Sequence, residues 1–156
     1  MYSKLKMGDL LHRSKGMVEH AGVYLGNTQV LHNQPGKGVN ITSYSEYSEG
    51  KEVKVTRTDE TNTQLLKMRI KEIVGNNSRY KLLENNCEHV ANYLITGRKF
   101  SPQIQATMAG VLIGAFAHSQ FNRGHFLLWI IGGGAMGLML STLMNKYDFC
   151  LSPTTY

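Results

Sequence analysis

Cysteine is scarce in this 156-residue chain, and its scarcity excludes a fold built on disulfide bridges. Only Cys87 and Cys150 occur, which is too few for the framework that stabilises small secreted domains, so a reducing compartment fits better. The N-terminal segment Met-Tyr-Ser-Lys-Leu-Lys-Met lacks the apolar core of a signal peptide. The formal net charge is +6, but long runs of lysine or arginine are missing. We therefore expect no nucleic-acid partner, and an anionic membrane surface explains the charge equally well.

Motifs for cofactors and metals are also missing. The sequence contains no glycine-rich phosphate loop and no dinucleotide-binding fingerprint. Four side chains are candidate zinc ligands: His20, His32, Cys87 and His89. The short Cys-x-x-Cys or His-x-x-x-His pairs of common zinc sites do not occur, however. The sequence therefore predicts neither a cofactor nor a bound metal.

Charged residues are absent from residues 126–144, a stretch about as long as a helix that crosses a bilayer core. Trp129 near one end and Tyr147 beyond the other suit an interfacial aromatic belt. The alternative is a buried core helix, but three consecutive glycines would each cost a soluble helix roughly 1 kcal/mol. We therefore predict a transmembrane anchor at 126–144, followed by a short tail at 145–156.

The residues around this anchor predict its orientation and its contacts. Most of the nearby positive charge precedes the span, so the positive-inside tendency predicts a cytosolic N-terminal domain. Gly133 and Gly137 have the Gly-x-x-x-Gly spacing that packs helices, which leaves a homo-oligomer through the anchor as an alternative. Residues 101–125 form a basic and apolar connecting segment. Its apolar part, 104–117, is too short to span comfortably, so it either lies on the membrane surface or packs against the anchor.

The first hundred residues alternate between strand, loop and helix patterns. Residues 7–16 predict a turn, a short strand and another turn, with His12 on a solvated strand face. Residues 34–52 predict an irregular loop with a short strand at 39–41. Charge alternates with β-branched side chains at 51–57, which indicates a half-buried strand.

A helix is predicted over residues 61–74, because apolar residues recur there at roughly helical spacing. Its core-facing residues are predicted to be Leu65, Leu66, Met68, Ile70 and Ile73. Its basic residues are predicted to form a solvated face: Lys67, Arg69 and Lys71.

Residues 17–33 form the strongest hairpin pattern, with a turn at Gly26-Asn27 and two histidines, His20 and His32. A two-residue turn would pair His32 with Ala21 and direct the two histidines to opposite faces of the sheet. A joint role for the histidines requires an odd loop or a bulge, which pairs His32 with Gly22 and places both on one face. The alternative is two unrelated polar residues on a half-exposed hairpin.

The second chemical signal is Cys87, which follows a polar turn and opens an amphipathic helix. Asn85 or Asn86 is the expected N-cap, and Gly97 the expected C-cap. In the first helical turn, unpaired backbone N–H groups and the positive end of the helix dipole favour a thiolate over a thiol. Such a cysteine needs only a neighbouring base to act as a nucleophile. The alternative is a small buried side chain without chemistry.

Cys87, His20 and His32 form a candidate triad of nucleophile, base and orienting group. In most papain-like enzymes the cysteine precedes the histidine, and here that order is reversed. This order, with His20-Ala-Gly-Val-Tyr-Leu-Gly and Asn86-Cys-Glu-His, resembles the H-box/NC family typified by lecithin:retinol acyltransferase. Residues 7–97 are most similar to its phospholipase A/acyltransferase branch, the HRAS-like suppressors, and the C-terminal apolar stretch also matches.

The resemblance implies an α+β fold. The expected form is a circularly permuted, NlpC-type papain-like fold, in which a small antiparallel sheet packs on the cysteine-bearing helix, with a hydrophobic helix added at the C-terminus. It also implies that Cys87 is the nucleophile that forms an acyl-thioester, that His20 is the general base and acid, and that His32 orients His20. His89 lies two positions beyond Cys87 on the helix and does not share its face, so its role is structural.

The resemblance implies a membrane-anchored thiol acyl hydrolase or acyltransferase, a phospholipase A or a related transferase, whose partners are a phospholipid substrate and the membrane. Residues 1–100 would form the catalytic domain. Two alternatives remain open. One is a cysteine peptidase or amidase, and the other is a non-catalytic membrane-remodelling or interaction protein like the viral 2A proteins.

Overall fold

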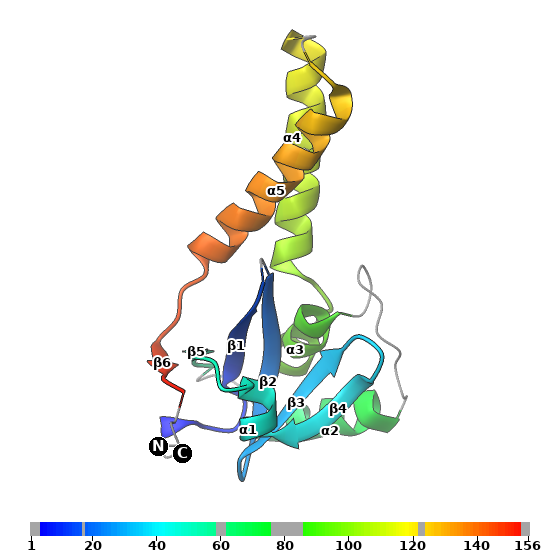
Figure 1. Cartoon of the computed structure of the whole chain (residues 1–156). Coiled ribbons are helices and arrows are strands. Elements are labelled where there is room, and N and C mark those ends of the chain that lie inside the picture. The colour runs from blue at the N-terminus through cyan, green and yellow to red at the C-terminus, as the bar shows by residue number, and fades with distance from the viewer. Residues whose placement is uncertain (1–3, 17, 59–61, 76–85, 122–123, 154–156) are drawn as a thin grey trace. The chain divides into compact units, whose positions relative to one another are not determined.

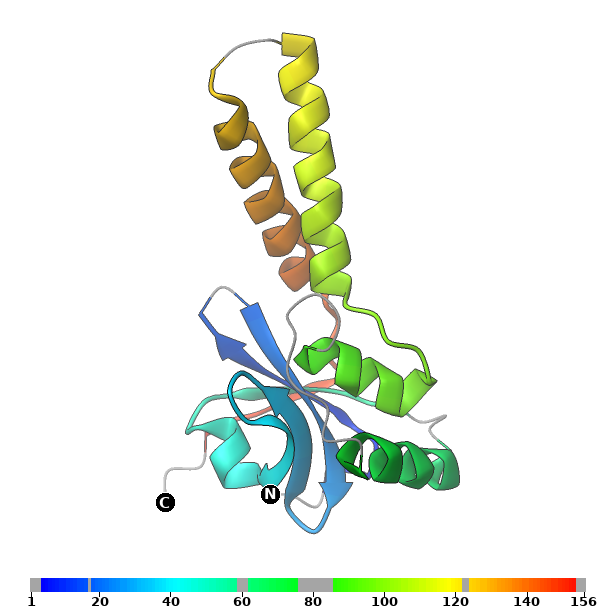
Figure 2. The same cartoon turned by 90° about the vertical axis from the view of Figure 1, so that its right-hand side faces the viewer.

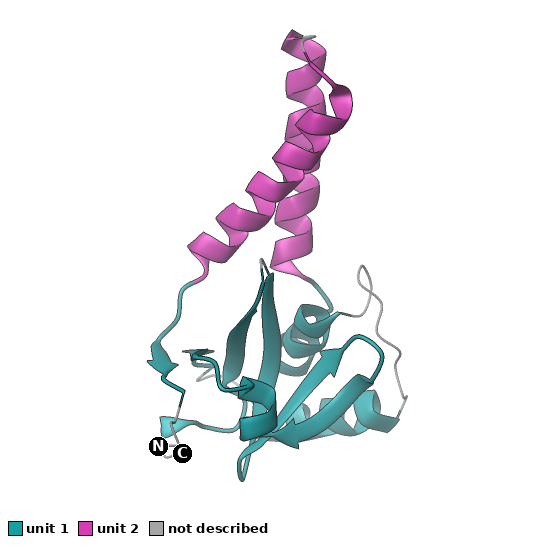
Figure 3. Ribbon diagram, in the orientation of Figure 1, with its two compact units in different colours: residues 1–100, 146–156 teal, residues 101–145 magenta. Residues whose placement is uncertain are grey.

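The computed structural model describes residues 4–16, 18–58, 62–75, 86–121 and 124–153. The chain divides into two compact units (Figure 3). The first unit contains residues 1–100 and 146–156, and the second contains residues 101–145. The extended piece expected just before the cysteine helix, together with Asn85, lies outside the described residues.

The first unit is built on a six-stranded sheet in which each neighbouring pair is antiparallel (Figure 1). Its strands are β1 (Leu10–Lys15), β2 (Val18–Gly26), β3 (Gln29–Gln34), β4 (Gly38–Ser43), β5 (Val53–Thr56) and β6 (Phe149–Leu151). Their order across the sheet is β4-β3-β2-β1-β5-β6. The expected small antiparallel sheet is therefore confirmed, and a C-terminal strand adds to it.

Helices cover both faces of this sheet. They are α1 (Tyr44–Ser48), α2 (Thr63–Gly75) and α3 (Cys87–Thr96). Helices α2 and α3 lie side by side (Figure 2), and they share a buried apolar cluster with Ala21, Val23 and Leu31 of the sheet. Residues that alternate with these in β2 and β3 face the other way, and their cluster includes Tyr47 of α1. The sheet therefore has a core on each face.

The segment 34–52 is more regular than its sequence indicates. Its strand extends over the whole of β4, and helix α1 follows where an irregular loop was expected, so that prediction is wrong. Ser43 and Glu46 form a capping box, in which the Ser43 hydroxyl accepts the Glu46 N–H and the Glu46 carboxylate accepts the Ser43 N–H. This cap starts a short helix that buries Tyr44 and Tyr47.

Helix α2 confirms the predicted helix, but its buried face is narrower than expected. Leu66 and Ile73 are buried, whereas Leu65 and Met68 are exposed. The prediction of a solvated Arg69 is also wrong. Its Nη1 donates to the carbonyls of Leu94 and Ile95, at 3.0 and 2.8 Å, and so pairs acceptors that the end of α3 leaves open.

The second unit consists of two helices packed against each other, α4 (Pro102–Phe121) and α5 (Phe126–Met144). The apolar stretch 104–117 therefore packs against the expected anchor, as the second of the two alternatives proposed. Within the described part of the chain, α5 is the single helix that is long and apolar enough to cross a membrane.

Candidate active site

Cys87 is the first residue of helix α3. The side-chain oxygen of Asn86 accepts the backbone N–H of His89 at 2.9 Å, which is the bond of an N-cap. At the other end Gly97 adopts a left-handed conformation, with φ of 78°, and its N–H donates to the carbonyl of Tyr93. Both predicted caps are confirmed, because local hydrogen bonding determines where this helix begins and ends.

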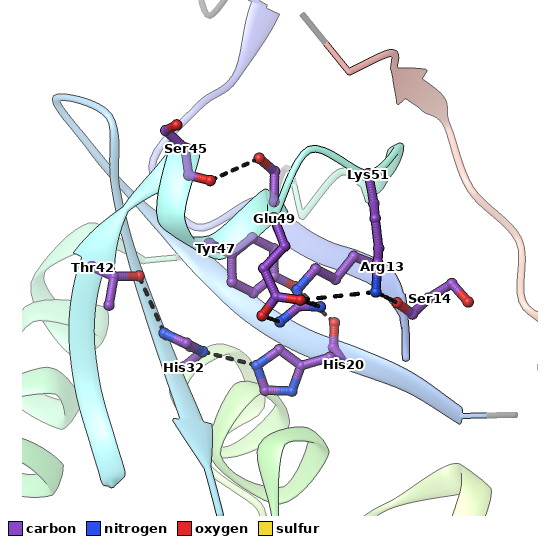
Figure 4. Close-up of polar contacts among 10 residues, drawn as sticks. Arg13, Ser14, His20, His32, Thr42, Ser45, Tyr47, Glu49 and Lys51 are labelled. Atoms are coloured by element: carbon purple, nitrogen blue, oxygen red, sulfur yellow. Dashed lines mark hydrogen bonds and ion pairs between the residues drawn. The ribbon is translucent and has the colours of Figure 1, made fainter. Parts of the chain in front are cut away.

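The hairpin β2–β3 brings the two histidines to one face. His32 lies opposite Gly22, and the register shifts between Tyr24 and Gly26, so the pairing is the bulged one. Nε2 of His20 lies 2.8 Å from Nδ1 of His32, and both side chains are buried (Figure 4). Nε2 of His32 lies 3.1 Å from the Thr42 hydroxyl on β4. The structure thus places both predicted histidines in one hydrogen-bonded chain that ends at Thr42.

Tyr47 of α1 packs against both imidazole rings. Its ring stacks on His20 with centroids 5.7 Å apart and meets the edge of His32 at 5.4 Å. Its hydroxyl lies within donor distance of two backbone carbonyls, 2.7 Å from that of His20 and 2.8 Å from that of Leu11. A Cβ at Gly22 would lie 2.8 Å from the Tyr47 ring, so only glycine leaves room for this contact.

A buried guanidinium lies beside the same group. Arg13 is 2% exposed, and it forms a two-fold ion pair with Glu49, at 2.8 and 2.5 Å (Figure 4). The guanidinium carbon also lies 5.7 Å from the centre of the Tyr47 ring. Glu49 is the C-cap of α1 and has a left-handed backbone, which places its carboxylate over Arg13. The short helix α1 therefore supplies both the aromatic and the acidic neighbour of Arg13.

These surroundings keep both histidines neutral. Burial, with smaller contributions from the neighbouring His32 and Arg13, lowers the pKa of His20 to about 3. Burial also lowers the pKa of His32 to about 4; Arg13 acts in the same direction and Glu49 opposes it. A neutral imidazole can accept a proton, so both rings are in the state that a general base requires.

The sulfur of Cys87 lies beside the N-terminal part of β2, where β2 extends beyond its pairing with β3. Tyr24 exchanges its backbone hydrogen bonds with the β1 side, since its N–H donates to Asp9 and its carbonyl accepts from Gly8. Because these directions alternate along a strand, Glu19 and Ala21 direct their backbone groups towards β3. The pairing of β2 with β3 ends at Gly22, so the backbone groups of Glu19 and Ala21 lie beyond the end of this pairing.

Sγ of Cys87 lies 4.0 Å from the Glu19 carbonyl, on the part of β2 that pairs with β1 and extends beyond the β2–β3 register. The neighbouring residue along the strand is His20. Cys87 is also among the groups that raise the pKa of Tyr47, after the larger effect of burial, although Tyr47 approaches from the other face of the sheet. The helix therefore brings the sulfur to the strand segment that carries His20.

The ionisation state of the Cys87 thiol differs from the one that the sequence predicts. Burial raises the pKa of Cys87, and this effect outweighs the backbone N–H of Ala21, which lowers it. The expectation that the helix start favours a thiolate is therefore wrong for this state of the protein. Desolvation of the sulfur is a larger effect here than the helix terminus, and the cysteine is a neutral thiol.

Two further histidines had predicted roles. His89, for which a structural role was predicted, is buried, and its Nδ1 has no hydrogen-bond partner among the described residues. His12 was expected on a solvated face, but it is half-buried against Tyr147, with ring centroids 5.5 Å apart. No group of three metal-ligating side chains occurs among the residues that the structure describes.

Four residues around the histidines were missed by the sequence reasoning: Arg13, Thr42, Tyr47 and Glu49. The signal for Tyr47 and Glu49 was present, since Ser43-x-x-Glu46 is a capping-box pattern that predicts α1. Thr42 would have followed from a longer β4. Arg13 carried no local signal, because its partner is distant in sequence.

Comparison with known proteins finds two families that are similar to the first hundred residues. Residues 1–58 match the model of the NlpC/P60 family, and residues 37–100 match the lecithin retinol acyltransferase model. A relative from Haemophilus influenzae, "Probable endopeptidase NlpC homolog", is 48% identical over 44 residues, which is 28% of this chain. The match spans only 23% of that relative's length. The histidine hairpin precedes the cysteine helix and the sheet packs on that helix. The first hundred residues are therefore similar to the lecithin retinol acyltransferase family, and their fold fits the papain-like fold of the NlpC/P60 proteins.

Proposed function

We propose that this protein is a membrane-anchored thiol acyl hydrolase or acyltransferase that acts on phospholipids through an acyl-cysteine intermediate. The two family matches indicate an acyltransferase or a cysteine hydrolase. The observation that carries the finer proposal is the position of Cys87. Its sulfur lies at the start of α3 against the strand segment that bears His20, and His20 is hydrogen-bonded to His32.

The first half of the reaction acylates the sulfur. When His32 donates from Nε2 to Thr42 and His20 donates from Nε2 to His32, Nδ1 of His20 is unprotonated. This nitrogen takes the Cys87 proton while the sulfur attacks an ester carbonyl of the phospholipid. The ester C–O bond breaks, the lyso-lipid oxygen receives the proton from His20, and a thioester remains on Cys87.

The second half returns the enzyme to its starting state. Water attacks the thioester in a hydrolase, and the amine of a second lipid attacks it in a transferase. His20 removes a proton from the attacking group and passes it to the departing Cys87 sulfur, so protons balance over the cycle. The backbone N–H of Cys87, at the helix start, is a suitable donor to the oxyanion in both halves.

A phospholipid substrate is supported by the apolar helix α5. Its 19 residues carry no charge, and its large side chains are mostly exposed in this chain. An enzyme held at a bilayer meets its lipid substrate at high local concentration. This argument separates the lipid substrate from other esters and amides that a thiol could attack.

A cysteine peptidase or amidase is the second candidate. It is favoured by the local identity to the "Probable endopeptidase NlpC homolog", although that match spans 44 residues. The same triad would attack an amide carbonyl, and His20 would protonate an amine leaving group. The two candidates therefore differ in substrate and share the acyl-cysteine.

The test uses the full-length chain in detergent micelles, with labelled phosphatidylcholine and, separately, a labelled peptide amide. We expect release of fatty acid, and an acyl adduct on Cys87 by mass spectrometry. Cys87→Ala should abolish both, whereas Cys150→Ala, which removes the other, exposed cysteine, should change neither. Cleavage of the peptide alone would reverse the order of the two candidates. Unchanged cellular function in the Cys87→Ala chain would favour a non-catalytic role.

A further inference from the structure

The residues after α5 belong to the sheet of the first unit. Strand β6 pairs with β5, with Leu151 opposite Val53 and Phe149 opposite Val55. Leu151 is 6% exposed, in the apolar cluster that contains Val53 and Val55. The N–H of Asp148 donates to the Val55 carbonyl at 2.8 Å. The C-terminal segment is therefore an integral strand of the domain that carries Cys87.

Side chains strengthen this attachment. The carboxylate of Asp148 accepts the backbone N–H of Arg57 at 2.6 Å. The Tyr147 hydroxyl donates to the buried carboxylate of Glu19, which also pairs with Lys54. The chain thus leaves the first unit after residue 100 and returns to it at residue 146. The residues that directly follow this return make specific side-chain contacts with the first unit.

This connection limits how the second unit can meet a membrane. If α5 alone crossed the bilayer, residues 145–156 would lie on the side opposite residues 1–100. Strand β6 could not then pair with β5. An intact sheet requires an even number of crossings, so α4 and α5 either both cross or both stay on one side.

Both helices are long enough to cross, although among the described residues α5 alone is also apolar enough to be recognised as a span by itself. Helix α4 has 20 residues and α5 has 19, which at about 1.5 Å per residue gives roughly 30 and 28 Å. The hydrocarbon core of a bilayer is about 30 Å thick. In residues 101–145 the sequence contains one charged residue, Arg123, between the two helices. It would reach the far headgroups if both helices crossed.

The outer surface of the helix pair is apolar on both helices. Large apolar side chains of α4 and α5 are half to three-quarters exposed: Met108, Leu112, Ile113, Phe116, Leu127, Leu128, Ile131, Met136, Met139, Leu140, Leu143 and Met144. The polar residues of α4 lie near its two ends, so this helix lacks the polar face of a surface-lying helix. A surface of this kind is suited to lipid chains.

The contact between the helices consists of glycine and backbone. A Cβ at Gly110 would lie 2.1 Å from the Gly133 carbonyl oxygen, and one at Gly114 would lie 2.1 Å from that of Trp129. A Cβ at Gly137 would lie 2.1 Å from the Ala106 carbonyl oxygen. Close backbone approach through small residues is how helices associate in lipid, where apolar side chains gain little by leaving their surroundings. The predicted Gly-x-x-x-Gly spacing thus contacts α4 of the same chain.

Aromatic residues gather where the two helices connect. Phe121 stacks on Trp129 with centroids 6.1 Å apart, and His118 meets the edge of Phe126 at 5.2 Å. Rings with polar atoms are favoured at the level of lipid headgroups. This end of the helix pair therefore has the composition of a membrane interface.

We propose that α4 and α5 form a helical hairpin that crosses the lipid bilayer twice, with both of its ends on the side that holds the first unit. On that side, β6 pairs with β5 and so attaches the returning chain to the sheet. This differs from the single span expected from the sequence. It does not depend on the chemistry of Cys87, so it can hold or fail independently of the proposed enzymatic function.

The test determines the side of three positions in the full-length chain, in sealed membrane vesicles. One chain keeps only the exposed Cys150 of β6, through Cys87→Ser. Two others lack both native cysteines and carry Ser14→Cys in β1 or His125→Cys between the helices. Each is treated with a membrane-impermeant maleimide before and after the vesicles are permeabilised. We expect residues 14 and 150 to react on the same side, and residue 125 on the other.

Three results would overturn the proposal. Opposite sides for residues 14 and 150 would mean a single crossing. The same side for all three would mean that the hairpin does not cross. Recovery of the chain in the soluble fraction, without detergent, would mean that a second copy or another protein covers the apolar surface. A fluorescence-detected melt of each variant in detergent shows whether it has folded.

Discussion

The imidazoles of His20 and His32 are joined by a 2.8 Å contact between Nε2 and Nδ1, in a buried site that disfavours their protonation. The contact can form with one ring as donor and the other as acceptor, but two protonated rings would repel each other. The sheet thus holds two bases in their neutral form next to the strand that Cys87 approaches. Several measurable properties depend on this arrangement.

Acid should destabilise the protein well before carboxylates protonate. The unfolded chain protonates both histidines near pH 6.5, whereas the folded chain does so only near pH 4 and 3. The unfolded state binds more protons in this interval, so stability falls as the pH falls from about 6.5 towards 4, by up to about 1.4 kcal/mol per pH unit for each ring. Urea unfolding in detergent micelles between pH 6.5 and 4.5 measures the slope.

A His20→Gln, His32→Gln double variant should show a flatter pH profile over the same interval. His125→Gln, which replaces an exposed histidine of the second unit, is the matched control. An equal slope in the parent and the double variant would contradict the neutral pair.

Cys87 should alkylate slowly at neutral pH. Burial raises the pKa of its thiol, so little thiolate is present before substrate binds. In a Cys150→Ser chain, the rate of reaction with iodoacetamide should rise with pH through a midpoint above the value of about 8.5 typical of a free thiol. The exposed Cys150 in a Cys87→Ser chain provides the reference. A plateau of fast reaction between pH 5 and 7 would instead indicate a preformed thiolate and imidazolium pair.

Removal of the buried guanidinium should make His32 a stronger base. Arg13 lowers the pKa of His32 and Glu49 raises it, so Arg13→Met leaves the carboxylate unopposed and the pKa should rise. The pKa can be followed through the ring proton resonances of His32 in an NMR titration. Lys51→Met removes the other cation near Glu49, at 3.8 Å and exposed, and should leave the His32 titration nearly unchanged. A pKa that did not move in Arg13→Met would show that burial alone sets it.

Two adjacent glycines of α5 should respond oppositely to alanine. A Cβ at Gly133 would lie 2.2 Å from the Gly110 carbonyl oxygen, whereas a Cβ at Gly132 meets nothing within 4 Å. Gly133→Ala should therefore separate α4 from α5 and cost about 1–3 kcal/mol. Gly132→Ala should be neutral or stabilising by up to about 1 kcal/mol, since alanine favours helix. Trp129, the only tryptophan, reports the melting of the helix pair by fluorescence. Equal midpoints would contradict the glycine contact.

The parts of the site that follow from local rules were predictable. Asn86 and Gly97 bound the cysteine helix through hydrogen bonds to residues within one turn, and the turn at Gly26 and Asn27 joins β2 to β3. The register of the hairpin was left between two alternatives. It depends on a bulge, and the register that forms places Gly22 against Tyr47, in a contact between segments distant in sequence.

The ionisation of Cys87 could not be predicted for a similar reason. The sequence shows that the residue opens a helix, which favours a thiolate, but desolvation depends on what covers the sulfur. Burial is a property of the packed domain. The same holds for Arg13, whose partner Glu49 caps the short helix α1, in a segment where the sequence predicts an irregular loop.

The sequence by itself determined the chemical groups, the helix that presents the cysteine, the strands that carry the histidines and the charge-free length of α5, because periodicity and capping act over a few residues. Tertiary structure alone decided which histidine nitrogens are in contact, whether the Cys87 thiol is ionised, and where the C-terminal segment lies in the sheet. Strand β6 has three residues and pairs with β5, which lies more than ninety residues earlier in the chain. So short a strand has no sequence pattern of its own, and only the open edge of β5 and the apolar core beside it make the pairing favourable.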